Sequence, residues 1–388
     1  MKICYINPTN NIRRPIAELA NILAKEGHEI SVMFPVSKEC PTKNWVANDA
    51  IKNGKINLIP IKSWYFAPLR YNVPNILQLI KETRKIYRTH NNIHIWEYYY
   101  LISVIPLLYS SLRKKRKEKT IITTDGFVGY PYRPKEPRWL TPAFMVYTHL
   151  FAKILFKIPN FVTIYGNAMI QPAIKLGIKK NKLKVIPTGI HLEKFKNVNQ
   201  NKVSALKKEF DITTEKIILY VGMLTERKRI DRVIKVSQDL LKEGLNVKTL
   251  LVGDSHGENI YKKLVKPEYK NKIIFAGGRT EIPELMQLAD VLVLLSEEEG
   301  LPGVVMESMA SSLPVVCTNV GCVSDLIENG KEGTLINFND YKKSLASIKK
   351  NLTNSIYRKK IKINCFNKIK KFEWIKVARL YYNTYLNN

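Results

Sequence analysis

The sequence lacks most of the short motifs that tie a chain to a particular reaction chemistry. Its 388 residues include five cysteines and six histidines, and no two cysteines form a C-x-x-C pair. An odd, scattered set of cysteines argues against a disulfide scaffold and a zinc ribbon, so we place the chain in a reducing compartment. The patterns D-x-D, H-E-x-x-H and G-x-x-x-x-G-K-[ST] are missing as well. We therefore expect no metal and no P-loop.

No segment suits a membrane-spanning helix, which needs about 20 apolar residues. The uncharged segment Tyr98–Leu112 is shorter and contains Pro106, and the apolar residues 142–159 include Lys153 and Lys157. Both segments suit buried core helices, and the second also suits a helix lying in a membrane interface. The first ten residues lack the charged-then-apolar pattern of a signal peptide, so we expect a cytoplasmic protein.

Acidic residues are scarce in two parts of the chain. Residues 1–200 contain 32 Lys and Arg against 11 Asp and Glu, and residues 351–388 contain nine against one. Residues 201–350 are nearly neutral, with 22 against 21. This asymmetry is typical of a protein in which one part meets a polyanion, either nucleic acid, phosphorylated lipid or anionic membrane. A simpler explanation is a proteome in which all proteins are rich in lysine, but this does not account for the nearly neutral residues 201–350.

Predicted strands and helices alternate along the chain. A strand at 2–8, a helix at 16–26 and a strand at 29–34 favour a parallel sheet with right-handed crossovers. The pattern restarts after Phe195. The other predicted strands are 56–60, 93–96, 120–124, 161–164, 184–187, 216–221, 247–252, 272–275, 291–295 and 315–318. We predict an α/β fold of two doubly wound units, with ligands at the carboxyl ends of the strands.

The segment Ser296–Pro314 has the pattern of a ligand-binding loop. It places Glu299 and two glycines between a predicted strand and a helix, with Glu307 one turn inside that helix. Free N–H groups at a helix start attract anions, and the two carboxylates suit the vicinal hydroxyls of a ribose or hexose. The alternative is an ordinary capped helix without a ligand. Its acidic residues would then be present because the positive end of the helix dipole favours negative charge.

The segment Tyr220–Asp231 has the pattern of a phosphate site. A glycine turn follows the strand, and the next helix begins near Arg227, Lys228 and Arg229. Cations beside free backbone N–H groups bind phosphate. A solvated basic turn is the alternative.

These segments resemble motifs of the retaining glycosyltransferases of family 4. The segment EGLPGVVMESMASSLPVV resembles the family's E-x7-E signature. Five others resemble family motifs in the correct order along nearly the whole chain: LAKEGHEISVMFP, KVIPTGIHLEKF, YVGMLTERKRID, TNVGCVSDLIENGKEGTLI and FEWIKVARLYYNTY. The resemblance implies the GT-B fold, in which two Rossmann-like domains face a central cleft. It places the acceptor domain at 1–190, completed by a helix at about 370–388, and the nucleotide-sugar domain at 191–369.

The resemblance also implies a role for each matching residue. Glu307 would bind the ribose of a nucleotide sugar, and Glu299 the transferred sugar. Lys228, with Arg227, would neutralise the diphosphate leaving group, taking the place of a metal. The remaining donor-binding candidates are Gly222, Arg279, Gly300, Leu301, Pro302 and Gly303.

The sequence departs from the family pattern at several positions. Met223 replaces the arginine of the phosphate loop, so Arg227 or Arg229 would have to compensate, and Arg229 itself replaces a glycine. On the acceptor side, Asn10 and Asn11 replace a Gly-Gly turn, and Asn tolerates the left-handed conformation that such a turn needs. Asp125 stands in place of a histidine of the first domain; it either orients the donor sugar or the acceptor hydroxyl as a catalytic group, or is a strand-end turn residue.

The resulting functional hypothesis is a retaining hexosyltransferase that needs no metal or other cofactor. Its partners would be a nucleotide-sugar donor, a lipid-linked or glycan acceptor, and an anionic membrane contacted by the basic first domain and the closing helix. The candidate contacts are Trp64–Arg70 and Arg138–Lys157. Alternatives are a phosphorylase or epimerase of the same fold, an inactive relative, and a nucleic-acid-binding protein, although the sequence has no nucleic-acid-binding motif.

Overall fold

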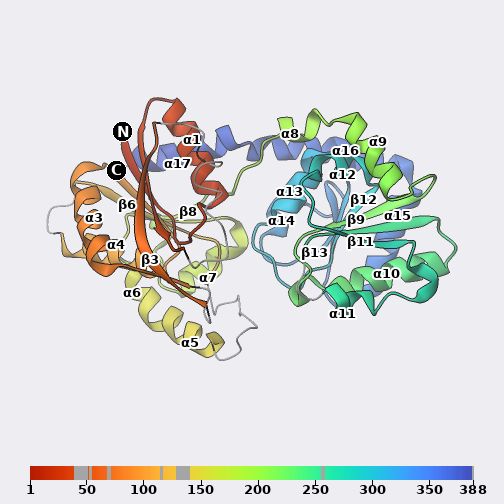
Figure 1. Cartoon of the computed structure of the whole chain (residues 1–388), viewed down its shortest axis with the longest axis horizontal. Helices are drawn as coiled ribbons and strands as arrows, with labels where there is room; N and C mark the ends of the chain where they lie inside the picture. The colour runs from red at the N-terminus through yellow and green to blue at the C-terminus, as the bar shows by residue number, and fades with distance from the viewer. Residues whose placement is uncertain are drawn as a thin grey trace. The chain divides into compact units, whose positions relative to one another are not determined.

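The computed structural model describes residues 1–38, 51, 55–67, 71–113, 117–127, 140–254 and 258–386. The chain forms two compact units (Figure 1). Unit 1 comprises Met1–Gly189 and Trp374–Asn388, and unit 2 comprises Ile190–Glu373. Parts of two predicted acceptor contacts, residues 68–70 and 138–139, lie outside the described residues.

Unit 1 is built on an eight-stranded sheet of order β4-β3-β2-β1-β5-β6-β7-β8. All neighbouring strands are parallel except β3 and β4, an antiparallel pair that the sequence analysis missed. The central strands are buried almost throughout, as expected for a parallel sheet covered on both faces. The strands are β1 Lys2–Ile6, β2 Glu29–Val36, β3 Asn57–Phe66, β4 Tyr71–Pro74, β5 Asn92–Trp96, β6 Lys119–Thr124, β7 Phe161–Ile164 and β8 Leu183–Val185.

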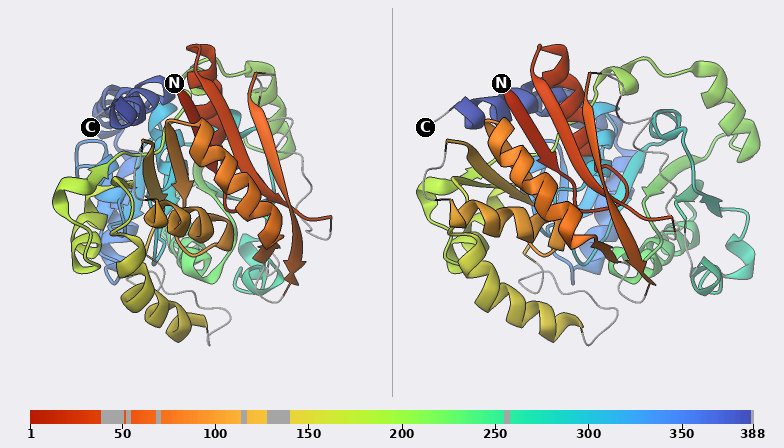
Figure 2. Two further views of the ribbon diagram at one scale, coloured as in Figure 1. Left: turned by 90° about the vertical axis from the view of Figure 1, so that its left-hand side faces the viewer. Right: turned by 60° about the vertical axis from the view of Figure 1, so that its left-hand side comes forward.

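The helices of unit 1 include the last helix of the chain, which packs beside the first (Figures 1 and 2). This α17 buries Trp374, Tyr381 and Tyr385, and the Tyr385 hydroxyl is hydrogen bonded to Nδ1 of the buried His94 at 2.7 Å. Burial holds the pKa of His94 well below its usual value. The helices are α1 Arg14–Lys25, α3 Ile76–Thr89, α4 Leu101–Leu112, α5 Leu140–Val146, α6 Lys153–Leu155, α7 Ile170–Lys175 and α17 Trp374–Leu386, with a π-helical segment at Tyr147–Ala152.

The two apolar segments of the sequence differ in burial. Helix α4 packs against α3 and buries Ile102, Pro106 and Leu107. The second segment, α5 to α6, buries only part of its apolar surface. Four of its side chains are more than half exposed: Val146, Leu150, Phe151 and Ile154. Among the described residues, no helix combines the length and apolar character needed to cross a membrane.

Unit 2 is built on a six-stranded parallel sheet of order β11-β10-β9-β12-β13-β14. The strands are β9 Lys216–Val221, β10 Val247–Val252, β11 Ile273–Gly277, β12 Val291–Leu294, β13 Val315–Thr318 and β14 Gly333–Ile336, the last of which the sequence analysis missed. The helices are α8 Glu193–Lys196, α9 Gln200–Glu209, α10 Ile230–Lys242, α11 Glu258–Lys262, α12 Ile282–Leu288, α13 Gly303–Ala310, α14 Val323–Leu326, α15 Tyr341–Thr353 and α16 Ser355–Ile369. Helix α10 begins right after the basic turn predicted from the sequence.

Each sheet has one point where the strand order reverses. In unit 1 it lies between β1 and β5, and in unit 2 between β9 and β12. Loops that leave the carboxyl ends of such strands diverge to opposite faces and leave room for a ligand. The candidate residues follow these four strands or the strand beside them, except Arg279, which follows the edge strand β11.

Candidate functional site

The loop after β9 in unit 2 is held by a close backbone packing of glycines. Gly222 has φ +150° and donates its N–H to the Val252 carbonyl at 2.9 Å. Gly253 lies so close that a Cβ at this position would overlap the Gly222 carbonyl oxygen. Both positions therefore require glycine. The packing fixes the path of the chain from Gly222 to the basic residues that follow.

Arg229 adopts the left-handed conformation, with φ +52° and ψ +50°. This explains why glycine would suit the position. Its guanidinium donates two hydrogen bonds to Asp231, at 3.0 and 2.7 Å, and lies over the Phe338 ring. Arg229 is therefore already paired with Asp231, and a phosphate would have to compete with that carboxylate for it. The Met223 side chain is 61% exposed.

The loop after β12 brings Glu299 to the basic turn. Lys228 donates from Nζ to Oε1 of Glu299 at 2.6 Å, and the Glu299 side chain is only 5% exposed. Arg227 lies 3.8 Å from the other carboxylate oxygen and donates to the Glu298 carbonyl at 3.0 Å. The two loops are thus joined across the point where the strand order reverses, with two cations around one buried carboxylate.

A third loop, after β13, supports the backbone of Glu299. Gly321 has φ +57°, and a Cβ there would overlap the Glu299 carbonyl oxygen. The next residue, Cys322, donates its N–H to the Gly300 carbonyl at 2.9 Å. Gly321 was not among the sequence candidates, although it lies in one of the segments that resemble the family.

Helix α13 begins directly after the β12 loop that carries Glu299. Its N-cap residue, Pro302, provides no side-chain hydrogen bond, and its first turn contains no acidic residue. Gly303 is exposed, with open space where a Cβ would lie, whereas Leu301 packs on the core. The start of the helix therefore offers N–H groups and a partial positive charge near the two cations. Glu307 is half-buried in the second turn.

Unit 1 has an ion cluster of its own at the carboxyl ends of its strands. Arg13, before α1, pairs with Asp125 after β6 and donates to Glu97 after β5 at 2.8 Å. Glu97 was not among the sequence candidates, and neither was Arg13. Arg13 and Glu97 are 84 positions apart in the sequence, so no local sequence pattern could indicate that they pair.

The turn at Asn10 and Asn11 lies next to this cluster in the chain. The buried Asn7 donates to the Asn11 carbonyl at 3.0 Å and accepts from the Arg13 N–H at 3.0 Å. Asn10 accepts from the Ser37 N–H at 3.2 Å. Neither asparagine has a positive φ. The expected left-handed turn is therefore wrong; side-chain hydrogen bonds, mainly from Asn7, hold the loop instead.

Comparison with known proteins identifies the family of unit 2. Residues 203–368 match the family described as glycosyl transferases group 1. This region is a group 1 glycosyltransferase domain. Across the whole chain, the structure is similar to Anabaena HepE solved with UDP and glucose, with a TM-score of 0.75, 16% identity and 99% of each chain covered. The GT-B fold expected from the sequence is thereby confirmed.

Two curated relatives are glycosyltransferases by name. The N-acetyl-alpha-D-glucosaminyl L-malate synthase of Bacillus anthracis is 31% identical over 140 residues, 36% of each chain. The UDP-Gal:alpha-D-GlcNAc-diphosphoundecaprenol alpha-1,3-galactosyltransferase of Escherichia coli is 27% identical over 218 residues. That match covers 52% of this chain and 55% of the relative. The chain thus spans about a third and about half the length of these two relatives.

One donor candidate of the group 1 domain is engaged elsewhere. Arg279 pairs with Glu209 of α9, lies over the Phe210 ring and donates to the Ala276 carbonyl at 2.9 Å. Its assignment to the donor stays a prediction, and a ligand would have to compete with Glu209 for it.

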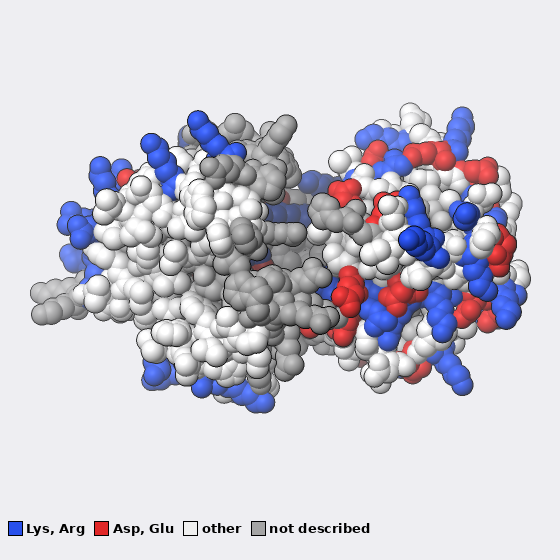
Figure 3. Space-filling view, turned by 60° about the horizontal axis from the view of Figure 1, so that its bottom comes forward, with Lys and Arg blue, Asp and Glu red and all other residues white. Residues whose placement is uncertain are grey.

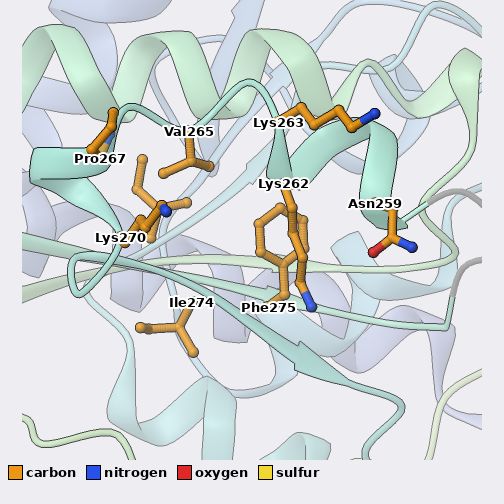
Figure 4. A pocket seen from close by; sticks show the side chains of 9 residues that line it. Asn259, Lys262, Lys263, Val265, Pro267, Lys270, Ile274 and Phe275 are labelled. Atoms are coloured by element: carbon orange, nitrogen blue, oxygen red, sulfur yellow. The ribbon is translucent and has the colours of Figure 1, made fainter.

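A groove of about 840 Å³ lies at the edge of the same domain (Figure 4). It is bordered by β11, the edge strand of the sheet, and by α11. Its lining includes Lys262, Lys263, Lys270 and Phe275, but none of the candidate site residues. The groove is therefore separate from the Lys228–Glu299 pair. In the described part of the chain, no three His, Cys, Asp or Glu side chains are grouped to hold a metal ion.

Proposed function

We propose that the protein is a retaining glycosyltransferase of family 4 that moves a hexose-type sugar from a nucleotide sugar to a lipid-linked or glycan acceptor. The observation that carries this proposal is the Lys228–Glu299 pair, at 2.6 Å, where the order of the group 1 sheet reverses. UDP is the first nucleotide to test, because it appears in the names of a relative and of a similar structure.

The proposed chemistry needs positive charge at the leaving diphosphate. Lys228, Arg227 and the start of α13 supply it, without a metal ion. Such prearranged groups act on charge that develops in the transition state, and one well-placed donor contributes about 3–4 kcal/mol. Glu307 holds the ribose hydroxyls, and Glu299 holds hydroxyls of the transferred sugar.

Retention follows from attack by the acceptor hydroxyl on the face that the diphosphate leaves, with the departing phosphate taking the proton. Glu299 is poorly suited to be a covalent nucleophile, because its carboxylate is buried and paired with Lys228. Isolation of a glycosyl–enzyme adduct on Glu299 or Asp125 would contradict this mechanism.

Transfer to a lipid-linked acceptor is the expected activity. The assay supplies UDP-glucose, UDP-galactose or UDP-N-acetylglucosamine together with N-acetylglucosaminyl diphosphoundecaprenol, and follows the product and its anomeric configuration. We expect an α-linked product from one of these α-linked donors, formed in the presence of a chelator. Release of free sugar or epimerised donor at the same rate without an acceptor would favour another reaction type of the same fold.

The charge of unit 1 supports an acceptor at an anionic membrane surface. Unit 1 carries 32 Lys and Arg against 10 Asp and Glu, and unit 2 carries 31 against 23. On the face drawn in Figure 3, unit 1 has basic side chains at its edges and very few acidic ones, whereas unit 2 shows both signs.

The expectation that the closing helix adds the positive charge of the tail to unit 1 is wrong for most of that charge. Only Lys376 and Arg379 lie on α17, and the other seven basic residues after position 350 belong to unit 2.

The exposed apolar side chains of α5 to α6 fit the same partner. Leu150, Phe151 and Ile154 are exposed beside Lys153, and residues 140–159 contain no acid. Apolar insertion and cationic attraction act together on an anionic bilayer, with each Lys or Arg near the surface contributing about 1 kcal/mol. The proposed location is the cytoplasmic face of a membrane.

Vesicle sedimentation tests this location. Vesicles with 30% anionic lipid are expected to retain the protein at low salt and to release it at high salt. Replacing Leu150, Phe151 and Ile154 by serine should weaken retention about tenfold or more, because burial of each apolar side chain contributes about 1.5–3 kcal/mol. The matched control is Ile356→Ser on α16, a more exposed isoleucine of unit 2. Equal retention by neutral vesicles, or an equal loss in the control, would contradict the proposal.

A further inference from the structure

Glu97 of unit 1 is a buried carboxylate in an unusual backbone conformation. It directly follows β5, its φ is +60°, and its side chain is 3% exposed. Non-glycine residues rarely adopt a positive φ, and they keep it only where the surroundings hold them. Here the Glu97 N–H donates to the Thr123 carbonyl at 2.8 Å. The backbone is thus held so that the side chain reaches the loops after β1 and β6.

Both carboxylate oxygens of Glu97 are occupied by neighbouring donors. Oε1 accepts from Arg13 at 2.8 Å and from the Asp125 N–H at 3.2 Å, and Oε2 accepts from the Thr124 hydroxyl at 2.8 Å. Burial raises the pKa of Glu97, and the charge of Arg13 opposes this rise. With its oxygens engaged in this way, Glu97 is suited to position other groups rather than to meet a substrate.

Asp125 is the group that this arrangement positions. Arg13 uses its second terminal nitrogen to pair with Oδ2 of Asp125, so one guanidinium links the two carboxylates. The other oxygen, Oδ1, is buried and accepts no hydrogen bond from the described residues. A buried acceptor without a donor is costly, and a hydroxyl group is a donor that satisfies it. One cation between two carboxylates leaves a net negative charge, which favours a hydroxyl over a phosphate.

The same layout occurs at the reversal point of unit 2. There a cation after the first strand, Lys228, pairs with a glutamate that follows the strand across the reversal, Glu299. In unit 1 the corresponding places, before α1 and after β5, hold Arg13 and Glu97. The unit 1 cluster therefore lies where a Rossmann-like unit binds its ligand.

We propose that Glu97 and Arg13 are positioning residues that orient the Asp125 carboxylate to accept a sugar hydroxyl, either of the transferred sugar or of the acceptor. This inference rests on the proposed function. It assigns the Arg13 guanidinium to holding the carboxylates of Glu97 and Asp125 rather than to binding a phosphate of the acceptor. It also gives the Asp125 carboxylate, whose side chain is 37% exposed, a ligand-binding role in place of the strand-end turn role that was its alternative.

A double-mutant cycle in the full-length protein tests this inference. Glu97→Gln keeps the size of the side chain but leaves one acceptor oxygen for three donors, so Arg13 and Asp125 lose their fixed positions. We expect Asp125→Asn to lower kcat/KM for transfer about 100-fold and Glu97→Gln about tenfold. In the Asp125→Asn background, Glu97→Gln should change kcat/KM less than about twofold. If the double variant instead loses kcat/KM by the product of the two single-variant factors, the two residues act independently and the inference is overturned.

The source of the hydroxyl is settled by two readouts. With UDP-glucose, UDP-galactose or UDP-N-acetylglucosamine and no acceptor, slower donor hydrolysis in Glu97→Gln identifies a hydroxyl of the transferred sugar. Unchanged hydrolysis with a raised KM for N-acetylglucosaminyl diphosphoundecaprenol identifies a hydroxyl of the acceptor. Either result supports the positioning role, and no change in both readouts overturns it.

Glu118→Gln is the matched control for folding. Glu118 is another buried carboxylate of unit 1, paired with Arg113 at 3.0 Å, but it precedes β6 instead of following it. The Glu118→Gln variant should lose stability to a degree similar to Glu97→Gln and keep the kcat/KM of the wild type. Equal losses of activity in Glu97→Gln and Glu118→Gln would overturn this inference alone. An inactive wild type that binds no nucleotide sugar would overturn the proposed function and this inference together.

Discussion

Replacement of Lys228 by alanine is expected to lower kcat by about 100- to 1,000-fold, the loss that follows removal of one donor to a developing oxyanion. In the structure, Lys228 donates to Glu299 at 2.6 Å and is itself 12% exposed, so its ammonium group has little competition from water. Under the proposed function, the variant loses the cation at the diphosphate; it also leaves the Glu299 carboxylate buried with only the more distant Arg227. Steady-state kinetics with the preferred donor measure the effect.

Two further variants test whether this loss of kcat is specific to the position of Lys228. Lys235→Ala removes an exposed lysine of α10 that lies over the Tyr341 ring, and it should leave kcat unchanged. Met223→Arg, which restores the family's arginine at an exposed position, should raise donor affinity in the wild type. A Lys228→Ala variant with a kcat within about threefold of the wild type would rule out a role for this lysine at the leaving group.

The sequence was informative where function depends on short segments. The loops after β9 and β12 could be predicted, because each combines a strand, glycines and charged residues within a few positions. The contact between Lys228 and Glu299 could be expected only through the family resemblance, since the two residues are 71 positions apart. Glu97 and Arg13 could not be found this way. An isolated glutamate after a strand and an arginine before a helix have no distinctive spacing.

The positions of most parallel strands along the chain were predictable because each central strand is a continuous buried run. Strands β4 and β14 were missed because neither is a continuous apolar run: β4 contains Asn72 and Pro74, and β14 begins with Gly333 and Thr334. The π-helical segment after α5 was not predictable either, because its exposed apolar face has the composition of a core helix. The charge total of the tail was also misleading, because the unit boundary after Glu373 divides its basic residues between unit 2 and unit 1.

Glu307→Ala is expected to weaken binding of the nucleotide sugar about 100-fold. A carboxylate that accepts from two ribose hydroxyls makes two hydrogen bonds to a charged group, each contributing about 1.5–3 kcal/mol. Glu307 is half-buried in the second turn of α13, near the end of the helix that carries partial positive charge. Glu328→Ala provides the control, because Glu328 is an exposed carboxylate of the same unit paired with Lys331.

The most direct test of the central claim, a nucleotide-sugar site in the group 1 domain, is a thermal-shift panel of UDP-, GDP- and ADP-sugars. A ligand at a hundred times its Kd stabilises the wild type by about 2.7 kcal/mol, which raises the Tm by several degrees. We predict such a shift with one nucleotide class in the wild type and in Glu328→Ala, and a shift of about one degree or less in Glu307→Ala. No shift with any nucleotide sugar, or the same shift in Glu307→Ala as in the wild type, would contradict the account.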